Sequence, residues 1–446
     1  SDLANDSDGP LYLLVEKDDS WAKWGRINTS VTAHLASFQR SMQGAQGHYE
    51  SVEIDANGYA KTEIDVFDAR VLEKKSHVEF ASPTGSLFYL KHNEVVADSI
   101  KIELETRDKV SGNVISTQTL REETDYEVNA AAGRIMLNKP LLEPENNQSL
   151  ITEQEEDDYN PVYLLVNYNY EVIDDWNKGI TGGVIRHSLN KKLRVGMVTI
   201  KEDQSEGVYE LDSIEATAFL DDDKKHKLDI AYAESASEVE PKYVSTDGGL
   251  TWQKSDVSIT NLDTNNQGAA FSLRGQYQSP NERVKLDYYY RDTESEFSAQ
   301  TRDSRQGWEA LGQNISAQIN DQIDLHLKYH HQWRKDLDNS EAEKTTELIN
   351  SRMATVQVNN QITERLSVSA ELRHQQSTQA DTSNQSHIDN EENTVAIQGR
   401  YQVSEDTEIA LKQQQTLKGE DKSHTAIDVR YRASENVTIK SGATHG

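Results

Sequence analysis

The sequence predicts an all-β protein, namely an antiparallel, up-and-down transmembrane β-barrel, or part of one, with a small β-sandwich insertion. Three observations predict this fold. Apolar and polar residues alternate with a period of two over segments of roughly 8–11 residues along most of the chain. Short turns alternate with long hydrophilic loops, as they do in transmembrane barrels. No apolar run approaches the ~18 residues that a membrane-spanning helix requires.

The composition limits the class of protein further. The 446 residues include 46 Lys and Arg against 76 Asp and Glu, a formal net charge of −30, and only 35% are hydrophobic. Low hydrophobicity with high charge is also typical of disorder, but the regular alternation argues against it. The strong negative charge, without any basic cluster, excludes nucleic acid as an expected partner. The absence of cysteine excludes disulfides, thiolate metal sites and cysteine nucleophiles.

Residues 173–446 are predicted to form the main hairpin series of the barrel. Phe271, Leu273 and Tyr277 alternate with polar residues, and a second arm of the same kind begins at Val284 after a turn. This unit recurs to give about seven hairpins. Long polar segments separate the hairpins, at 292–307, 334–351, 375–393 and 418–423. A soluble sandwich has no reason to place every long loop at one end, so this asymmetry favours the barrel.

The alternation divides these strands into two faces. The polar face carries too much charge for a dry core, so we expect it to line a water-filled lumen, while the apolar face contacts lipid. The alternative is an exposed antiparallel sheet whose polar face meets solvent. We assign ten residues to the lumen and eight to the lipid. The lumen residues are Arg274, Lys285, Asp287, Arg291, Asp324, His326, Lys328, Arg373, Arg400 and Arg430, and the lipid residues are Leu286, Tyr288, Leu325, Leu327, Val368, Leu372, Ile397 and Val429.

Residues 1–82 are expected to contribute N-terminal barrel strands, and residues 83–172 to form the β-sandwich module. Segments 21–38 and 48–67 have the pattern of two long strands joined by a turn at 41–47. Short apolar strands every 8–12 residues, separated by turn residues, favour a sandwich in 83–172. With one hairpin before it, the module leaves the barrel at the edge that carries the long loops. That edge is the extracellular one in a bacterial barrel.

The chain shows no arrangement of catalytic or cofactor-binding residues. His326, Lys328 and His330 share one face of a strand, but lining a polar lumen explains them without a metal. Acidic groups at 221–223 and 263–268 lack the EF-hand arrangement, so solvated turns are a better interpretation than Ca²⁺ sites. The nucleophile-elbow, P-loop, dinucleotide and zinc-protease motifs are absent. We therefore predict no enzymatic activity, no metal and no cofactor.

One short motif predicts a local structure. Ser245, Asp247, Gly249, Thr251 and Trp252 match the Asp-box pattern S-x-D-x-G-x-T-W, so the segment resembles hairpin turns of sialidases and other propellers. The resemblance implies that Asp ties down the turn, Gly permits a positive φ and Trp packs beneath. The motif occurs once, whereas a propeller would need it in several blades. We expect a folded hairpin within the loop 237–267, with carbohydrate binding as the alternative role.

A second resemblance concerns the whole protein. Residues 124–141 (TDYEVNAAAGRIMLNKPL) resemble a strand pair of the pattern DYxVDYxxGRIxLxxPL, found in β-sandwich modules attached to very large outer-membrane and translocon-type barrels. The hairpin series at 183–443 also resembles bacterial outer-membrane barrels in its pattern. Such barrels usually end on an aromatic residue, whereas this chain ends in Gly446. Three alternatives follow: the barrel continues beyond this chain, other subunits complete it, or the barrel interpretation is wrong.

Two functional hypotheses follow, from different classes. The first is a porin-, translocon- or scaffold-like barrel that forms a polar-lined channel or an anchor in the bacterial outer membrane. Its partners would be outer-membrane lipid and further barrel-forming, periplasmic or surface subunits. The alternative is a secreted or surface-displayed β-rich adhesin or filament protein. Its apolar face would have to be buried against a second sheet or a neighbouring subunit.

Overall fold

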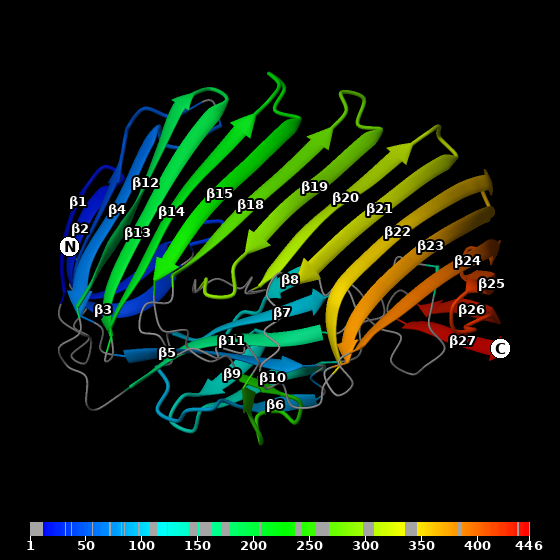
Figure 1. Ribbon diagram of the computed structural model, residues 1–446, viewed down its shortest axis with the longest axis horizontal. Coiled ribbons are helices and arrows are strands. Elements are labelled where there is room, and N and C mark those ends of the chain that lie inside the picture. The colour runs from blue at the N-terminus through cyan, green and yellow to red at the C-terminus, as the bar shows by residue number, and fades with distance from the viewer. Residues whose placement is uncertain are drawn as a thin grey trace.

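In the computed structural model, one large curved sheet arches over a smaller β-rich module (Figure 1). The structure describes residues 12–31, 33–36, 38–55, 57–70, 73–81, 83, 85–96, 99–107, 114–122, 124–141, 150–151, 162–171, 179–204, 207–236, 243–254, 267–297, 307–334, 346–381, 386–434 and 437–445. Within these ranges, no helix has the length and apolar character needed to cross a membrane.

The large sheet has 18 strands, and every neighbouring pair is antiparallel. In spatial order they are β1 (Leu13–Lys17), β2 (Ser20–Val31), β3 (Phe38–Glu50), β4 (Thr62–Arg70), β12 (Gly179–Asn190), β13 (Leu193–Gln204), β14 (Gly207–Phe219), β15 (His226–Ala236), β18 (Gln267–Gln278), β19 (Val284–Thr293), β20 (Trp308–Gln318), β21 (Ile323–Arg334), β22 (Thr346–Thr363), β23 (Leu366–Asp381), β24 (Ser386–Ser404), β25 (Thr407–Lys418), β26 (His424–Ser434) and β27 (Val437–His445).

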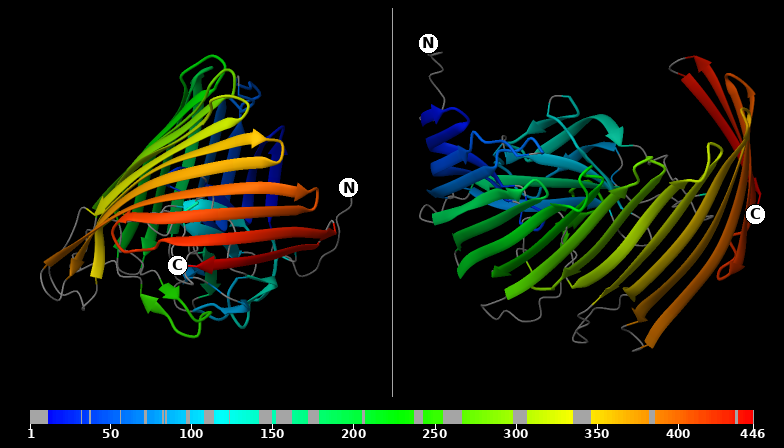
Figure 2. Two further views of the ribbon diagram at one scale, coloured as in Figure 1. Left: turned by 90° about the vertical axis from the view of Figure 1, so that its right-hand side faces the viewer. Right: turned by 90° about the horizontal axis from the view of Figure 1, so that it is seen from above.

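The strands follow one another up and down, with two excursions away from the sheet. The first lies between β4 and β12, and the second between β15 and β18. Successive strands rotate steadily, so that the sheet curves round and its last strands turn through a wide arc (Figure 2). No pairing joins β1 to β27 among the described residues. The sheet therefore has the architecture of a barrel wall, and closure is not seen in it.

The two edges of the sheet differ. Tight connections such as 191–192, 279–283, 364–365 and 405–406 all lie at one edge, called here the short-turn edge. The longer connections between β15 and β18, β19 and β20, and β21 and β22 leave from the opposite edge, called the long-loop edge. This division has exceptions, since the longer β3–β4 connection (51–61) lies at the short-turn edge and the short β13–β14 connection lies at the long-loop edge. Both connections to the module, after Arg70 and before Gly179, also lie at the long-loop edge.

The module consists of two small sheets packed face to face. The six-stranded sheet has the order β17 (Gln253–Lys254), β16 (Tyr243–Ser245), β5 (Glu73–Ala81), β11 (Val162–Glu171), β7 (Lys101–Arg107) and β8 (Val114–Thr119). The three-stranded sheet has the order β6 (Gly85–Tyr89), β10 (Arg134–Leu141) and β9 (Tyr126–Asn129). Phe80, Phe88, Ile102, Ile135 and Leu164 are fully buried between them. The sheet thus also takes in β5, which precedes residue 83, and two strands from the second excursion.

The predicted fold class is confirmed, since the molecule is all-β, with an antiparallel up-and-down sheet and an inserted β-sandwich. Several predicted boundaries are wrong. Segment 41–47 is not a turn but lies inside β3, and the chain reverses instead near 33–36 and 51–61. Segment 375–393 is not a long loop, because β23 and β24 pair through most of it. Nearly every residue of this segment is polar, so its sequence lacks the apolar alternation that indicates a strand.

Candidate functional site: the two faces of the sheet and the module that spans it

The register of the strands places the predicted site residues on two opposite faces. Because directly paired residues in an antiparallel sheet point to the same side, faces can be followed from strand to strand. All ten residues assigned to the lumen lie on one face, called here the inner face. All eight residues assigned to lipid lie on the other, the outer face. What each face contacts in the membrane stays a prediction.

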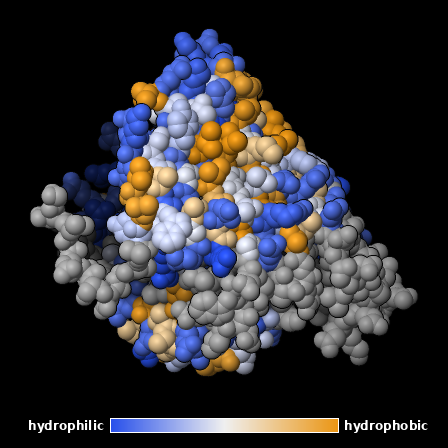
Figure 3. Space-filling model, turned by 90° about the vertical axis from the view of Figure 1, so that its left-hand side faces the viewer, coloured by the Kyte–Doolittle hydropathy of each residue, from blue (hydrophilic) through white to orange (hydrophobic). Residues whose placement is uncertain are grey.

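The outer face presents large apolar side chains to its surroundings along the whole sheet. Figure 3 shows apolar patches among hydrophilic side chains on the side that faces left in Figure 1. Charged residues of this face, such as Lys201 paired with Glu210 at 2.5 Å, lie toward the long-loop edge. A soluble monomer seldom leaves so extended an apolar surface uncovered. The exposed members include Trp24, Tyr49, Val66, Ile185, Met197, Ile214, Tyr232, Val356, Leu372, Ile397, Leu411 and Val429.

The outer face also contains a glycine that is covered by an aromatic ring. Tyr288 lies across Gly275 on the neighbouring strand, and a Cβ built at Gly275 would clash with its ring. The Tyr288 hydroxyl lies 3.0 Å from Nε2 of His226. The ring shields a stretch of backbone that has no side chain of its own, which stabilises a sheet at a glycine.

The inner face is dry in its N-terminal half. Ile27, Met42, Phe67 and Ile200 are fully buried there, together with Leu35 and Ala36 from the β2–β3 connection. The prediction that the polar face of 173–446 is too charged for a dry core does not hold for β12–β15, whereas the residues from which it was made, Arg274 to Arg430, lie on β18–β26. The reason is tertiary, because the 33–36 segment turns inward and covers apolar positions that the strand pattern leaves open to water.

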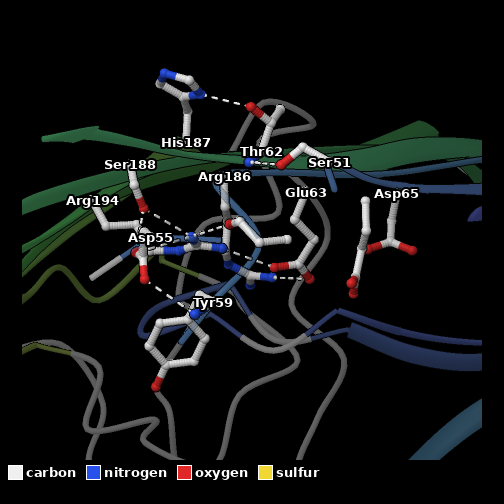
Figure 4. A network of polar contacts seen from close by, with 12 residues as sticks. Ser51, Asp55, Tyr59, Thr62, Glu63, Asp65, Arg186, His187, Ser188 and Arg194 are labelled. Carbon is white, nitrogen blue, oxygen red and sulfur yellow. Dashed lines mark hydrogen bonds and ion pairs between the residues drawn. The ribbon is translucent and has the colours of Figure 1, made fainter. Parts of the chain in front are cut away.

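A ladder of charged side chains crosses the inner face beside this apolar cluster. Arg186 on β12 and Arg194 on β13 converge on Glu63 of β4, at 3.3 and 3.0 Å (Figure 4). Arg186 also reaches Glu215 of β14 at 3.2 Å. Each arginine is only partly exposed, so the carboxylates compensate for charge that would otherwise be poorly solvated. The ladder joins four neighbouring strands by charge-assisted hydrogen bonds.

The ladder is anchored at the short-turn edge by the loop 51–61. The Ser188 hydroxyl donates to Asp55 Oδ2 at 2.6 Å, and Arg194 donates to Ser188 Oγ at 3.1 Å (Figure 4). Burial raises the pKa of the Asp55 carboxyl, but the hydrogen bonds from Ser188 and from the amides of Asn57 and Tyr59 outweigh it and leave the pKa below its usual value. Asp55 is therefore held as a carboxylate that fixes this loop on the sheet.

At the other end of the ladder, the 33–36 segment is held by two carboxylates. The His34 amide donates to Glu215 Oε2 at 3.2 Å, and the His34 ring lies 3.7 Å from Asp229. Asp229 also accepts from the Thr217 hydroxyl at 2.7 Å and pairs with Lys227 at 2.8 Å. Acidic residues of β14 and β15 thus hold the segment that fills the inner face.

The module touches the inner face far from its own attachment points. The Leu150 amide donates to Glu371 Oε2 of β23 at 2.5 Å, and Leu150 and Ile151 pack with Ala396 of β24. Glu371 is buried and also pairs with Arg373 at 3.4 Å. The module is tethered at β4 and β12, so this contact spans the concave side of the sheet from one flank to the other.

The Asp-box segment holds the second excursion onto the module. The Ser245 hydroxyl donates to Asp247 Oδ1 at 2.8 Å, and the Thr251 amide donates to the same oxygen at 2.9 Å. Hydrogen bonds from Thr251 lower the pKa of Asp247 to about 2. Gly249 has a φ of 95°, and a Cβ there would clash with the carbonyl oxygen of Tyr89. Trp252 packs on Phe80 at 5.4 Å between ring centroids.

This hairpin adds a parallel strand to the module. β16 pairs with β5, and Gly248 O accepts from the Tyr89 amide at 2.9 Å. The segment 243–254, called here the clamp, therefore binds the β15–β18 connection to both sheets of the module. The sequence motif pointed to the hairpin, but nothing in it indicated this partner.

Other candidate residues from the sequence are not brought together as a site. His326 contacts Ser316 and His330 contacts Tyr289, both on the inner face. Asp222 pairs with Lys192 at 2.6 Å in a turn, and segment 263–268 lies mostly outside the described residues. No group of three or more metal-ligating side chains occurs in the described part of the chain.

Sequence reasoning missed the ladder, the inward segment at 33–36 and the contact of Leu150 with Glu371. The signal for the ladder was present, since Glu63 and Asp65 alternate with apolar residues on β4, and Arg186 and Ser188 are two residues apart on β12 and so share a face. Which carboxylate meets which arginine depends on the pairing of β4 with β12. The intervening module separates those two strands in the sequence, so the alternation alone does not reveal the pairing.

No protein-family model and no curated protein matches this sequence. Among solved structures, the P pilus usher (PapC) translocation pore aligns over 98% of this chain and 82% of its own, at 10% identity and a TM-score of 0.39. The FrpB iron transporter from Neisseria meningitidis aligns over 60% of this chain, at 9% identity and a TM-score of 0.33. This chain spans about half of FrpB, 52% of its length.

A P pilus tip assembly intermediate from E. coli, PapC-PapD-PapK-PapG, aligns over 97% of this chain and 54% of its own, at 11% identity and a TM-score of 0.33. The matches are to outer-membrane barrels, the class that the sequence resembles.

Proposed function

We propose that this chain forms the wall of an outer-membrane β-barrel that acts as a polar-lined channel or anchor. The observation that carries the proposal is the division of the sheet into two faces. Exposed large apolar side chains lie on the outer face of strands from β2 to β26, while the charged ladder and the predicted lumen residues lie on the inner face. A wall between lipid and water requires this alternation, and charged residues on the lipid side are costly.

The module supports a more specific role within that barrel. It is covalently attached at the long-loop edge, held by the clamp and braced against β23 through Leu150. We propose that it partly fills the mouth of the channel on that side. In an outer-membrane barrel the longer loops face the cell exterior, which would make the module extracellular. We propose no enzymatic activity for the chain.

The alternative function is a secreted or surface-displayed adhesin or filament protein. The observation that favours it is that the described residues show no pairing between β1 and β27. Open strand edges invite pairing with another chain, and a subunit assembly would also cover the outer face. In the membrane proposal the same edges must be paired as well, because lipid satisfies no backbone hydrogen bond.

Two tryptophans on one strand distinguish these functions. Trp24 is on the outer face with 54% of its surface exposed, whereas Trp21 is on the inner face and stacks on His48. Single-tryptophan variants that keep either residue would be reconstituted in vesicles containing brominated phosphatidylcholine. We expect the bromine to quench Trp24 and to leave Trp21 nearly unchanged.

Equal quenching of both tryptophans, or a chain that stays monodisperse without detergent and does not insert, would contradict the membrane proposal. A chain that inserts should also migrate differently in gels before and after boiling, as folded barrels do. Planar-bilayer conductance of the inserted chain would separate a channel from an anchor. If the wild-type module blocks conductance, the Trp252→Ala variant, which weakens the clamp, should open it.

A further inference from the structure

The inner face of β18–β27 has a charge opposite in sign to that of the whole chain. Among described side chains it carries ten cations and six carboxylates, although the chain as a whole has a formal charge of −30. The cations are Arg274, Lys285, Arg291, Lys328, Arg334, Arg373, Arg400, Lys412, Arg430 and Arg432, and the carboxylates are Asp287, Asp324, Glu371, Glu392, Glu408 and Asp428.

Half of these cations are exposed and have no ion pair within the described structure. They are Arg274, Lys285, Arg400, Arg430 and Arg432, and Arg400 alone has a side-chain hydrogen bond, to Gln398 at 3.0 Å. All five lie in the half of their strands nearest the short-turn edge. Their positive charges are therefore exposed to solvent on the concave side of the sheet and are not neutralised by a neighbouring carboxylate.

Half of the carboxylates on this surface are already engaged. Glu371 pairs with Arg373 and accepts from the Leu150 amide, and Glu392 pairs with Lys422 at 2.9 Å. Asp287 accepts from the Gln276 side chain at 3.0 Å. The remaining carboxylates are Asp324, Glu408 and Asp428, of which Glu408 lies opposite Arg430 in the register. The Gln276 amide is neutral, so Asp287 keeps its negative charge, and five exposed cations face four carboxylates that have no cation partner among the described residues.

The other half of the inner face has an acidic excess among its described side chains, but most of its carboxylates are paired or buried. The carboxylates are Glu16, Glu50, Glu63, Asp65, Glu202, Glu215 and Asp229, against Lys23, Arg186, Arg194 and Lys227. On β4, β12, β13 and β14, Arg186 and Arg194 are paired with Glu63 and Glu215 in the ladder. Asp229 is paired with Lys227. Asp65 and Glu50 contact His48, and Glu202 is buried. Paired charges of opposite sign produce little field at a distance, so the exposed cations of β18–β27 determine the sign of the potential along their own part of the wall.

We propose that the inner face of β18–β27 makes the channel selective for anionic solutes, against the sign of the protein's net charge. The inference rests on the proposed channel function and deepens it by naming the class of solute. Rings of arginine and lysine along a pore attract anions and repel cations, and the low-dielectric lipid around the wall strengthens the effect. Because the acidic residues lie mostly elsewhere, the overall charge of the chain does not set the preference.

The test uses the full chain in planar bilayers with potassium chloride at two concentrations across the membrane, so that the reversal potential gives the ion preference. We expect chloride to permeate at least about 3 times better than potassium. The triple variant Arg274→Glu, Arg400→Glu and Arg430→Glu should reverse the preference. Lys201→Glu on the outer face, where the lysine is exposed, is the matched control and should leave it unchanged.

The outcomes separate this inference from the proposed function. A conducting wild-type chain that prefers potassium, or a triple variant that still prefers chloride, overturns the anion selectivity and leaves the channel intact. If neither the wild type nor Trp252→Ala conducts, the channel proposal fails and the selectivity fails with it. If the triple variant does not fold, as judged by its gel migration before and after boiling, the neutral Arg→Gln variants at the same positions should abolish the preference.

Discussion

At the scale of single residues, neighbours in the sequence occupy opposite environments. Leu327 lies on the outer face between Ile315 and Val356, whereas Lys328 lies on the inner face opposite Asn314 and Thr355. If the outer face contacts lipid, Leu327→Arg should lower the free energy of unfolding by about 2–4 kcal/mol near the bilayer midplane. Lys328→Arg should leave it nearly unchanged. Chemical unfolding in vesicles measures both, and equal losses would be incompatible with a sheet between two solvents.

Two titratable residues of the module should make its stability depend on pH. Burial and then the nearby Lys91 lower the pKa of His92 to about 4, from 6.5 in an unfolded chain. His92 contacts the Tyr168 hydroxyl at 2.9 Å and stacks on Tyr170 with ring centroids 3.8 Å apart. As pH falls from 6.5 to about 4, the unfolded chain binds a proton that the folded module does not. The module should lose roughly 1–2 kcal/mol over this window, after allowance for partial exposure.

Glu79 makes the stability of the module depend on pH over a lower pH range than His92 does. Burial raises the pKa of Glu79, but the hydrogen bond from His77 and the ion pair with Arg107 at 3.1 Å outweigh burial and lower the pKa from 4.5 to about 2. Its stabilising contribution is complete above pH 4.5 and is lost as pH falls toward 2. Hydrogen exchange of β7 and β11 against pH measures both windows. His92→Phe should remove the loss of stability between pH 6.5 and about 4 and keep the loss between pH 4.5 and about 2. If the variant still loses the same stability between pH 6.5 and about 4, the role of His92 is refuted.

At the scale of elements, the clamp is the part that is most easily tested. Trp252 packs on Phe80, and Gly249 lies against the backbone of Tyr89 in a conformation that disfavours a side chain. Trp252→Ala should destabilise the module by about 2–3 kcal/mol, because it removes a partly buried aromatic ring. Faster hydrogen exchange should appear in β5 and β6, the two strands that the clamp contacts.

The matched control for the clamp is Leu250→Ala. Leu250 belongs to the same hairpin but is 73% exposed, so its removal should leave exchange in β5 and β6 unchanged. Equal effects of the two substitutions would show that the hairpin stabilises only itself. Gly249→Ala should resemble Trp252→Ala, since the added Cβ forces the hairpin away from β6.

At the scale of the whole molecule, the two edges of the sheet should lie on opposite sides of the membrane. The chain contains no cysteine, so single cysteines report position without background. Glu405 is exposed in the β24–β25 turn at the short-turn edge, and Glu420 is exposed in the β25–β26 connection at the long-loop edge. In intact cells, an impermeant maleimide should label Glu420→Cys and should reach Glu405→Cys only after permeabilisation, because long loops face outward.

Protease protection provides an independent readout of the same topology. Protease added to intact cells should cut within 334–351 and spare the turn at Pro280, which lies at the short-turn edge. Labelling of Glu405→Cys or cleavage at Pro280 in sealed cells would reverse the assigned orientation. The module, which leaves from the long-loop edge, would then be periplasmic.

The sequence by itself determined the faces of the residues on the apolar-alternating strands, but not the extent of polar strands such as β3 and the facing ends of β23 and β24. Alternation with a period of two is a local property, so Leu286 and Lys285 are separated by the pleat whatever the strand pairs with. Only the tertiary structure decided the pairing of β4 with β12, the addition of β16 to β5 and the contact of Leu150 with Glu371. Each joins segments far apart in the chain. A strand pattern states which side chains share a face, but it does not state which distant strand or loop will cover that face.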